Sequence, residues 1–301
     1  MSGSSVAPAT SNAIGGAAVS RWYNWAGSIV LAGVAIAAAP AHADQVDERV
    51  VCAPGVTPVA PISDRLPVNQ NFSDRDLARF ALPYAQMISD ATRRWRDNLE
   101  PYGFVRGEDS TAVFAEIGDG AMLSQIASGF YGTTFFHCRE KAIVVAIRSV
   151  EFYDLRDFLG ALDRQIASGE AEPALVFFDA IRARYPDYSI SVTGHSSAGG
   201  IASWVGAVRS VPTVVFDATR TDASLSNDGR DQLAVRVAGD VLSDPDATAP
   251  PGIMRMVESL TDREEVLSGT ELEIEPVNEA LFTLQLHWSG FLIRELELLA
   301  D

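Results

Sequence analysis

The chain has 301 residues, of which 47% are hydrophobic and 9% aromatic, and it carries a formal net charge of −17. These hydrophobic fractions are too high for a disordered chain, and the length is sufficient to bury one large core. The acidic balance argues against a nucleic-acid partner and against charge-driven binding to anionic membranes, because such partners are themselves negatively charged.

An apolar run from Trp25 to Pro40 follows an N-terminal segment in which Arg21 is the only charged residue. The run ends at Ala41-His42-Ala43, a small-x-small cleavage pattern, and it is short for a membrane span. We therefore expect residues 1–43 to be a secretory signal peptide. The same pattern predicts an exported protein, periplasmic or secreted, with no stable transmembrane anchor after cleavage.

Residues 44–72 are rich in proline and show no hydrophobic periodicity, which predicts an extended arm before a domain at 73–301. The two cysteines are Cys52 in this arm and Cys138 in the domain. Export to an oxidising compartment favours a disulfide between them, and two unpaired small hydrophobic side chains are the alternative. No histidine or cysteine neighbours them at ligand spacing, so a structural zinc site is not expected.

The first regular element of the domain is a helix that Ser73 caps, with apolar residues at helical spacing as far as Trp95 and Pro83 as a potential kink. Residues 132–138 and 142–149 follow, joined by a three-residue turn. They predict a β-hairpin with one partly exposed strand and one buried strand.

The second half of the domain alternates between helical and strand patterns. Amphipathic stretches at 154–167 and 174–185 precede a strand at 188–193, a helix at 201–208, and strands at 211–216 and 233–238. This alternation predicts an α/β fold with a mostly parallel central sheet covered by helices on both faces.

Between the strand at 188–193 and the following helix lies Gly194-His195-Ser196-Ser197-Ala198-Gly199-Gly200. A sharp strand-to-helix turn exposes a nucleophilic serine only where its flanking residues are small, as Gly194 and Ala198 are around Ser196. The rival nucleophile, Ser197, places His195 at a crowded position, so Ser196 is favoured. A glycine-rich loop or a phosphate-binding turn is the alternative interpretation.

Residues 192–203, VTGHSSAGGIAS, resemble the Val-Thr-Gly-His-Ser-Leu-Gly-Gly-Ala-x-Ala-Ser segment of class 3 lipases and their lipase-like bacterial relatives. The strand ending at Val150 resembles the family's strand that closes in Arg-Gly-Thr, and GDVLSDP from Gly239 resembles its Asp-x-Val segment. The resemblance implies an α/β-hydrolase fold and hydrolysis of lipid or other acyl esters. It also implies an oxyanion hole formed by the backbone N–H groups of Val150 and Ser197.

A serine nucleophile needs an imidazole to take its proton and a carboxylate to orient that imidazole. In this architecture the residues occur in the order serine, acid, histidine, and His287 is the only histidine after Ser196. A helix-capping surface role is the alternative for His287. Asp240, which follows the strand at 233–238, is the expected acid, and its preference over Asp217 rests on the Asp-x-Val resemblance.

The sequence thus predicts an exported serine esterase or lipase-like enzyme that forms an acyl-enzyme on Ser196 and needs no metal or organic cofactor. Its expected partner is a small-molecule or lipid ester substrate. A catalytically weak or inactive binding module is the alternative, because Ser149 and Val150 replace the family's Gly and Thr and Ala198 replaces a glycine. The segment at 250–256 is open to two interpretations, part of a lid or a packing insertion.

Overall fold

The structure is a computed structural model, and it describes residues 72–93, 99–148, 169–218, 231–240, 242–244, 269–276 and 289–301. The expected signal peptide, the proline-rich arm up to residue 71, the helical stretch at 154–167 and the segment at 250–256 lie outside these residues. The same is true of Cys52, Val150 and His287.

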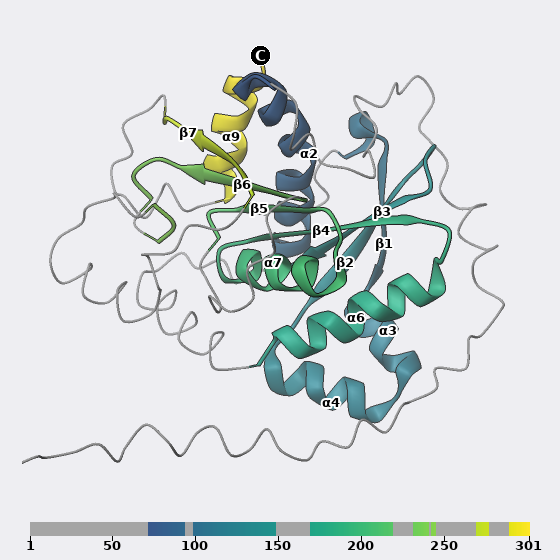
Figure 1. The fold of residues 1–301 in the computed structure, drawn as a ribbon. Coiled ribbons are helices and arrows are strands. Elements are labelled where there is room, and N and C mark those ends of the chain that lie inside the picture. Colours follow the sequence, from purple (N-terminus) through teal and green to yellow (C-terminus); the bar gives the residue numbers. More distant parts are fainter. Residues whose placement is uncertain are drawn as a thin grey trace, which may run out of the picture. The chain divides into compact units, whose positions relative to one another are not determined.

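Among the described residues, seven strands form one sheet in the order β1-β2-β3-β4-β5-β6-β7 (Figure 1). The strands are β1 (Phe104–Asp109), β2 (Gly132–His137), β3 (Ala142–Ile147), β4 (Ser189–His195), β5 (Thr213–Phe216), β6 (Gln232–Val237) and β7 (Thr270–Ile274). The pairs β1-β2 and β2-β3 are antiparallel, and every pair from β3 to β7 is parallel. The predicted mostly parallel sheet is therefore confirmed.

The helices of the described residues are α2 (Asp74–Arg93), η2 (Glu100–Tyr102), α3 (Ser110–Ile117), α4 (Asp119–Ser128), α6 (Ala171–Arg184), α7 (Ser197–Arg209) and α9 (Ser289–Ala300). Within the described ranges, none of them has both the length and the apolar content needed to cross a membrane.

Alternate residues of β3 enter two different cores. Val144 and Ala146 pack into the cluster that contains α2 and α9, whereas Ile143, Val145 and Ile147 pack into the cluster that contains α3, α6 and α7. Successive side chains of a strand point to opposite faces, so helices cover both faces of the sheet. This three-layer arrangement, with the parallel strands at its centre, is the α/β-hydrolase fold that was expected.

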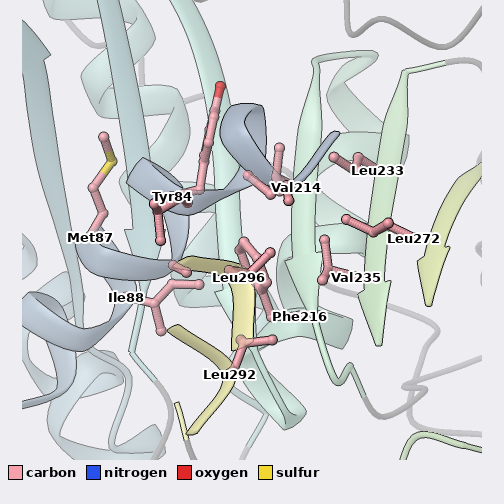
Figure 2. Close-up of a cluster of buried hydrophobic side chains, with 14 of the residues drawn as sticks. Tyr84, Met87, Ile88, Val214, Phe216, Leu233, Val235, Leu272, Leu292 and Leu296 are labelled. Atoms are coloured by element: carbon pink, nitrogen blue, oxygen red, sulfur yellow. The ribbon is translucent and has the colours of Figure 1, made fainter. Parts of the chain in front are cut away.

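Figure 2 shows the core on the α2/α9 face. One apolar cluster contains Tyr84, Met87 and Ile88 of α2, Leu292 and Leu296 of α9, and Val214, Phe216, Leu233, Val235 and Leu272 of β5, β6 and β7. Helix α9 is also tied to α2 by the guanidinium of Arg79, whose Nε donates to the carbonyl oxygen of Ala300 at 2.7 Å. The C-terminal helix is thus fixed on the sheet by both apolar and polar contacts.

Helix α2 begins as predicted, with a reciprocal cap at Ser73. The backbone N–H of Asp76 donates to Ser73 Oγ at 3.3 Å, and the N–H of Ser73 donates to Asp76 Oδ2 at 3.3 Å. The side-chain hydrogen bond from Ser73 holds the pKa of the Asp76 carboxyl below its usual value. The helix continues across Pro83 to Arg93.

The hairpin at 132–147 is confirmed, but the expectation of one partly exposed strand was wrong. Every residue of β2 and of β3 is buried, because β1 pairs with the outer side of β2 and helices cover both faces. Helix α7 begins at Ser197, four residues before the predicted start at 201, because the glycine-rich segment already forms its first turn.

Cys138, directly after β2, is disulfide-bonded, and its expected partner Cys52 lies outside the described residues. The pairing of these two residues stays a prediction. Thiol titration of the denatured, unreduced protein is expected to find no free thiol. Because a bridge between the arm and the domain closes a long loop in the unfolded chain, Cys138→Ser is expected to lower the free energy of unfolding by about 4 kcal/mol. Two titratable thiols in the wild-type chain would contradict the pairing.

Candidate active site

Three candidate residues follow three neighbouring strands at one edge of the sheet. His195, Phe216 and Val235 lie side by side across β4, β5 and β6. Ser196 and Asp217 come directly after the first two, and Asp240 follows the turn that ends β6. Parallel strands present their carboxyl ends at the same edge, which is where open α/β sheets bind ligands.

Ser196 has the strained backbone of a nucleophile elbow. Its φ is 58° and its ψ is −132°, a conformation that costs a non-glycine residue roughly 1–3 kcal/mol. Two hydrogen bonds hold it there, from the N–H of Ser196 to the carbonyl of Phe216 at 3.0 Å and from the N–H of Gly199 to the carbonyl of Ser196 at 2.9 Å. Ser197 already belongs to α7, so the apex of the turn falls on Ser196 and not on Ser197.

The turn leaves no room for a side chain at Gly194. A Cβ at this position would lie 2.3 Å from the backbone oxygen of Ala198. Gly194→Ala is therefore expected to lower the free energy of unfolding by about 3 kcal/mol, measured by denaturant titration, and to abolish labelling by a serine-directed phosphonate. Gly120→Ala in α4 is the matched control, because a Cβ there has nothing within 4 Å and alanine favours a helix. Equal stability of the two variants would contradict a closed elbow.

The hydroxyl of Ser196 is buried, with 1% of the residue exposed, and its Oγ has no hydrogen-bond partner among the residues that the structure describes. The backbone N–H of Ser197 lies at the N-terminus of α7, where the helix dipole favours negative charge. Ile147 of β3 pairs with Gly194, so the chain that leads to Val150 leaves β3 at the same edge as the elbow. Val150 itself lies outside the described residues.

Asp240 is fully buried and held by local donors. Its Oδ1 accepts the backbone N–H of Leu242 at 3.2 Å, and its Oδ2 accepts the hydroxyl of Ser243 at 2.5 Å. Asp244 restrains the same turn, because its Oδ2 accepts the N–H of Gly239 at 2.7 Å. A carboxylate with two donors stays charged more readily than one without them.

Asp217, the alternative acid, is also fully buried, and it has a left-handed φ of 40°. Its Oδ1 accepts the N–H of Val237 at 2.9 Å, and its Oδ2 lies 3.9 Å from Nε2 of His195. Asp217 therefore faces the histidine inside the elbow, and both candidate acids are buried at the same edge of the sheet. Nowhere in the described ranges do histidine, cysteine, aspartate or glutamate side chains group as a metal site would require.

His137, which precedes the elbow in the sequence, lies at the opposite end of the strands, where the parallel strands begin. Residue 136 pairs with Ile143 and Ile143 pairs with Ile190, so His137 is level with the start of β4, roughly 20 Å along the strand from Ser196. Its Nδ1 accepts the N–H of Glu140 at 3.1 Å, and burial lowers the pKa of the imidazole. This position excludes His137 as a base for Ser196.

The remaining candidate base, His287, lies outside the described residues, two positions before α9 begins. The site also contains a residue that the sequence analysis did not single out, Ser243, whose hydroxyl contacts both Asp240 and Asp217. Its signal was present in the sequence, since it stands three residues after the expected acid in GDVLSDP.

No protein-family model and no curated protein sequence matches this chain. Among solved structures, the chain is similar to a Rhizomucor miehei lipase in complex with its propeptide, at 13% identity and a TM-score of 0.41 over 68% of this chain and 80% of that one. A mutant protein from Penicillium cyclopium gives 14% identity and a TM-score of 0.42 over 71% and 84%. A triacylglycerol lipase described as having a serine protease triad at its catalytic centre gives 11% and 0.42 over 69% and 82%. At TM-scores below 0.5, these likenesses assign neither a function nor a site residue to this chain.

Proposed function

We propose that this protein is an exported serine hydrolase that cleaves carboxylic esters, with lipid or other acyl esters as its substrates. Ser196 is the nucleophile, His287 the general base and Asp240 the acid that orients His287. The backbone N–H groups of Val150 and Ser197 bind the oxyanion. The observation that carries the proposal is the strained turn at Ser196, which lies at the same end of the parallel strands as the buried and hydrogen-bonded Asp240.

The reaction proceeds in two steps through an acyl-enzyme. Ser196 Oγ attacks the ester carbonyl carbon while His287 takes its proton, and Asp240 stabilises the imidazolium that forms. The tetrahedral intermediate collapses as the imidazolium returns that proton to the leaving alkoxide, which departs as the alcohol. Water then attacks the acyl-enzyme in the same way, His287 takes one water proton and returns it to Ser196 Oγ, and the carboxylic acid is released.

The backbone strain at Ser196 supports the proposal, because the fold maintains it although it lowers the free energy of unfolding. A serine held at φ 58° costs roughly 1–3 kcal/mol, which a glycine at the same position avoids. The buried carboxylate of Asp240 is a second cost to stability, because desolvation disfavours its charge. Neither the strained backbone nor the buried carboxylate stabilises the fold. A serine on a sharp turn and a buried carboxylate are, however, both parts of an acyl-transfer site.

The function is tested with purified mature protein, an active-site phosphonate and p-nitrophenyl esters of increasing acyl length. We expect a stoichiometric phosphonate adduct and ester turnover, with the acyl-length profile defining the substrate class. A folded protein that shows neither adduct nor turnover would instead be the non-catalytic binding module that uses the same fold.

Asp240→Asn tests the assignment of the acid. The amide keeps the shape of the side chain but no longer stabilises an imidazolium, so kcat is expected to fall by about 10⁴-fold. The measurement is steady-state hydrolysis of the best p-nitrophenyl ester, with circular dichroism as the folding control. If Asp240→Asn stays active and Asp217→Asn is the variant that loses 10⁴-fold, the acid is Asp217.

A further inference from the structure

The proposed triad leaves Asp217 without a role, although the structure constrains this residue strongly. It is fully buried and adopts a left-handed φ, which costs an aspartate about 1 kcal/mol. One carboxylate oxygen accepts the N–H of Val237 in β6, and the other faces His195, the residue that precedes Ser196. Asp217 thus lies between the elbow after β4 and β6, the strand that precedes Asp240.

Ser243 connects Asp217 to Asp240. Its Oγ lies 2.5 Å from Asp240 Oδ2 and 3.3 Å from Asp217 Oδ1. A serine hydroxyl has a single hydrogen, and the shorter distance assigns that hydrogen to Asp240. Because both carboxylates contact one oxygen atom, these two carboxylate oxygens lie within roughly 6 Å of each other, close enough for their charges to interact.

The described groups that face this pair come from each neighbouring strand or turn. His195 is the last residue of β4, and the N–H of Val237 belongs to β6. The N–H of Leu242 and the hydroxyl of Ser243 belong to the turn after β6. Asp244 of the same turn is directed to Arg236 and to the N–H of Gly239. These contacts form a continuous polar network from His195 through Asp217 and Ser243 to Asp240.

From this polar network we infer that Ser243 and Asp217 are positioning residues that fix the carboxylate of Asp240 and connect it to the nucleophile elbow. This inference deepens the proposed function and rests on it. Two buried carboxylates this close together disfavour each other's charged form, and burial adds a desolvation cost. The arrangement therefore serves the orientation of Asp240 toward the base and not the stability of the fold.

Ser243→Ala removes the donor and keeps the size of the side chain, whereas Ser243→Thr keeps a hydroxyl. We expect Ser243→Ala to lower kcat by 10- to 100-fold with KM unchanged, and Ser243→Thr to restore most of the loss. Ser203→Ala is the matched control, because Ser203 is also half-buried and its hydroxyl has one side-chain partner, Gln232 at 2.7 Å. That control is expected to keep wild-type kcat.

Asp217→Asn removes the charge and keeps an acceptor for Val237. Loss of a nearby negative charge destabilises an imidazolium, so the acidic limb of the pH profile for kcat/KM is expected to move down by about half a pH unit. A residue that served only to hold the fold would lower Tm and leave this limb in place. We expect Tm to stay the same or rise.

A readout independent of turnover separates this inference from the proposed function. In a carboxyl ¹³C NMR titration, assigned with Asp240→Asn, Ser243→Ala is expected to raise the pKa of the Asp240 carboxyl by about one unit, and Ser243→Thr is not. An unchanged titration overturns the positioning role even in an active enzyme. A wild-type protein that gives the expected titration but neither adduct nor turnover refutes the hydrolase and, with it, a role in catalysis for Ser243.

Discussion

Replacing Ser196 with alanine is expected to lower kcat for p-nitrophenyl esters by about 10⁶-fold, because the members of a catalytic triad act as a unit and the nucleophile has no substitute. The same variant should lose the phosphonate adduct that mass spectrometry places on Ser196 in the wild-type protein. Residual hydrolysis reflects substrate binding and the oxyanion donors alone.

Two companion variants make the result specific. Ser197→Ala keeps the backbone N–H that is proposed to bind the oxyanion, so its kcat is expected to stay close to that of the wild type. Ser196→Gly is as inactive as Ser196→Ala but more stable by about 1 kcal/mol, because glycine adopts φ 58° without strain. A phosphonate adduct on Ser197 would transfer the nucleophile to that residue.

His287→Ala is the second substitution with a large effect, and kcat is expected to fall by between about 10⁴- and 10⁶-fold. Without the imidazole, Ser196 keeps its proton at neutral pH and is a poor nucleophile. The double variant Ser196→Ala/His287→Ala is expected to be no slower than Ser196→Ala alone, because each single substitution already disables the unit. Steady-state kinetics of the three variants measures this non-additivity.

His137→Ala serves as the control for His287→Ala. His137 lies at the opposite end of the strands from the elbow, so its loss removes packing against Phe104 but no chemistry. We expect lower thermal stability with unchanged kcat. Full activity in His287→Ala would refute the order of serine, acid and histidine on which the triad rests.

Local pattern was sufficient to predict the sharp strand-to-helix turn at Ser196. Gly194 and Ala198 identify Ser196 by a steric argument, and the backbone has its strained residue there. The choice between Asp217 and Asp240 had no such basis, because both are buried aspartates after neighbouring strands. The sequence could place each of them after a strand, but it could not show that one hydroxyl contacts both.

Strand β1 escaped prediction because tertiary contacts stabilise a polar sequence, FVRGED. Arg106 pairs with Asp90 of α2, and Glu108 pairs with Arg184 of α6, so charged side chains that disfavour a strand in isolation are neutralised by partners distant in sequence.

Strand β7 was missed although its residues alternate. Leu272 and Ile274 are buried, whereas Glu271 and Glu273 pair with Arg236 of β6. The alternation spans only five residues, and glutamate is uncommon in strands, so the sequence pattern alone did not identify this strand. The cross-strand pairs with Arg236 offset the charge of the two glutamates.

The packing of α9 on α2 also bears on the order in which the chain folds. These helices are the last and the first that the structure describes, and together they close one face of the sheet. Until residues 289–300 have been synthesised, the apolar cluster on this face lacks Leu292 and Leu296. Contacts between residues so far apart in sequence form late and slowly. The nascent chain therefore exposes an apolar surface until α9 has been synthesised, a state that chaperones bind.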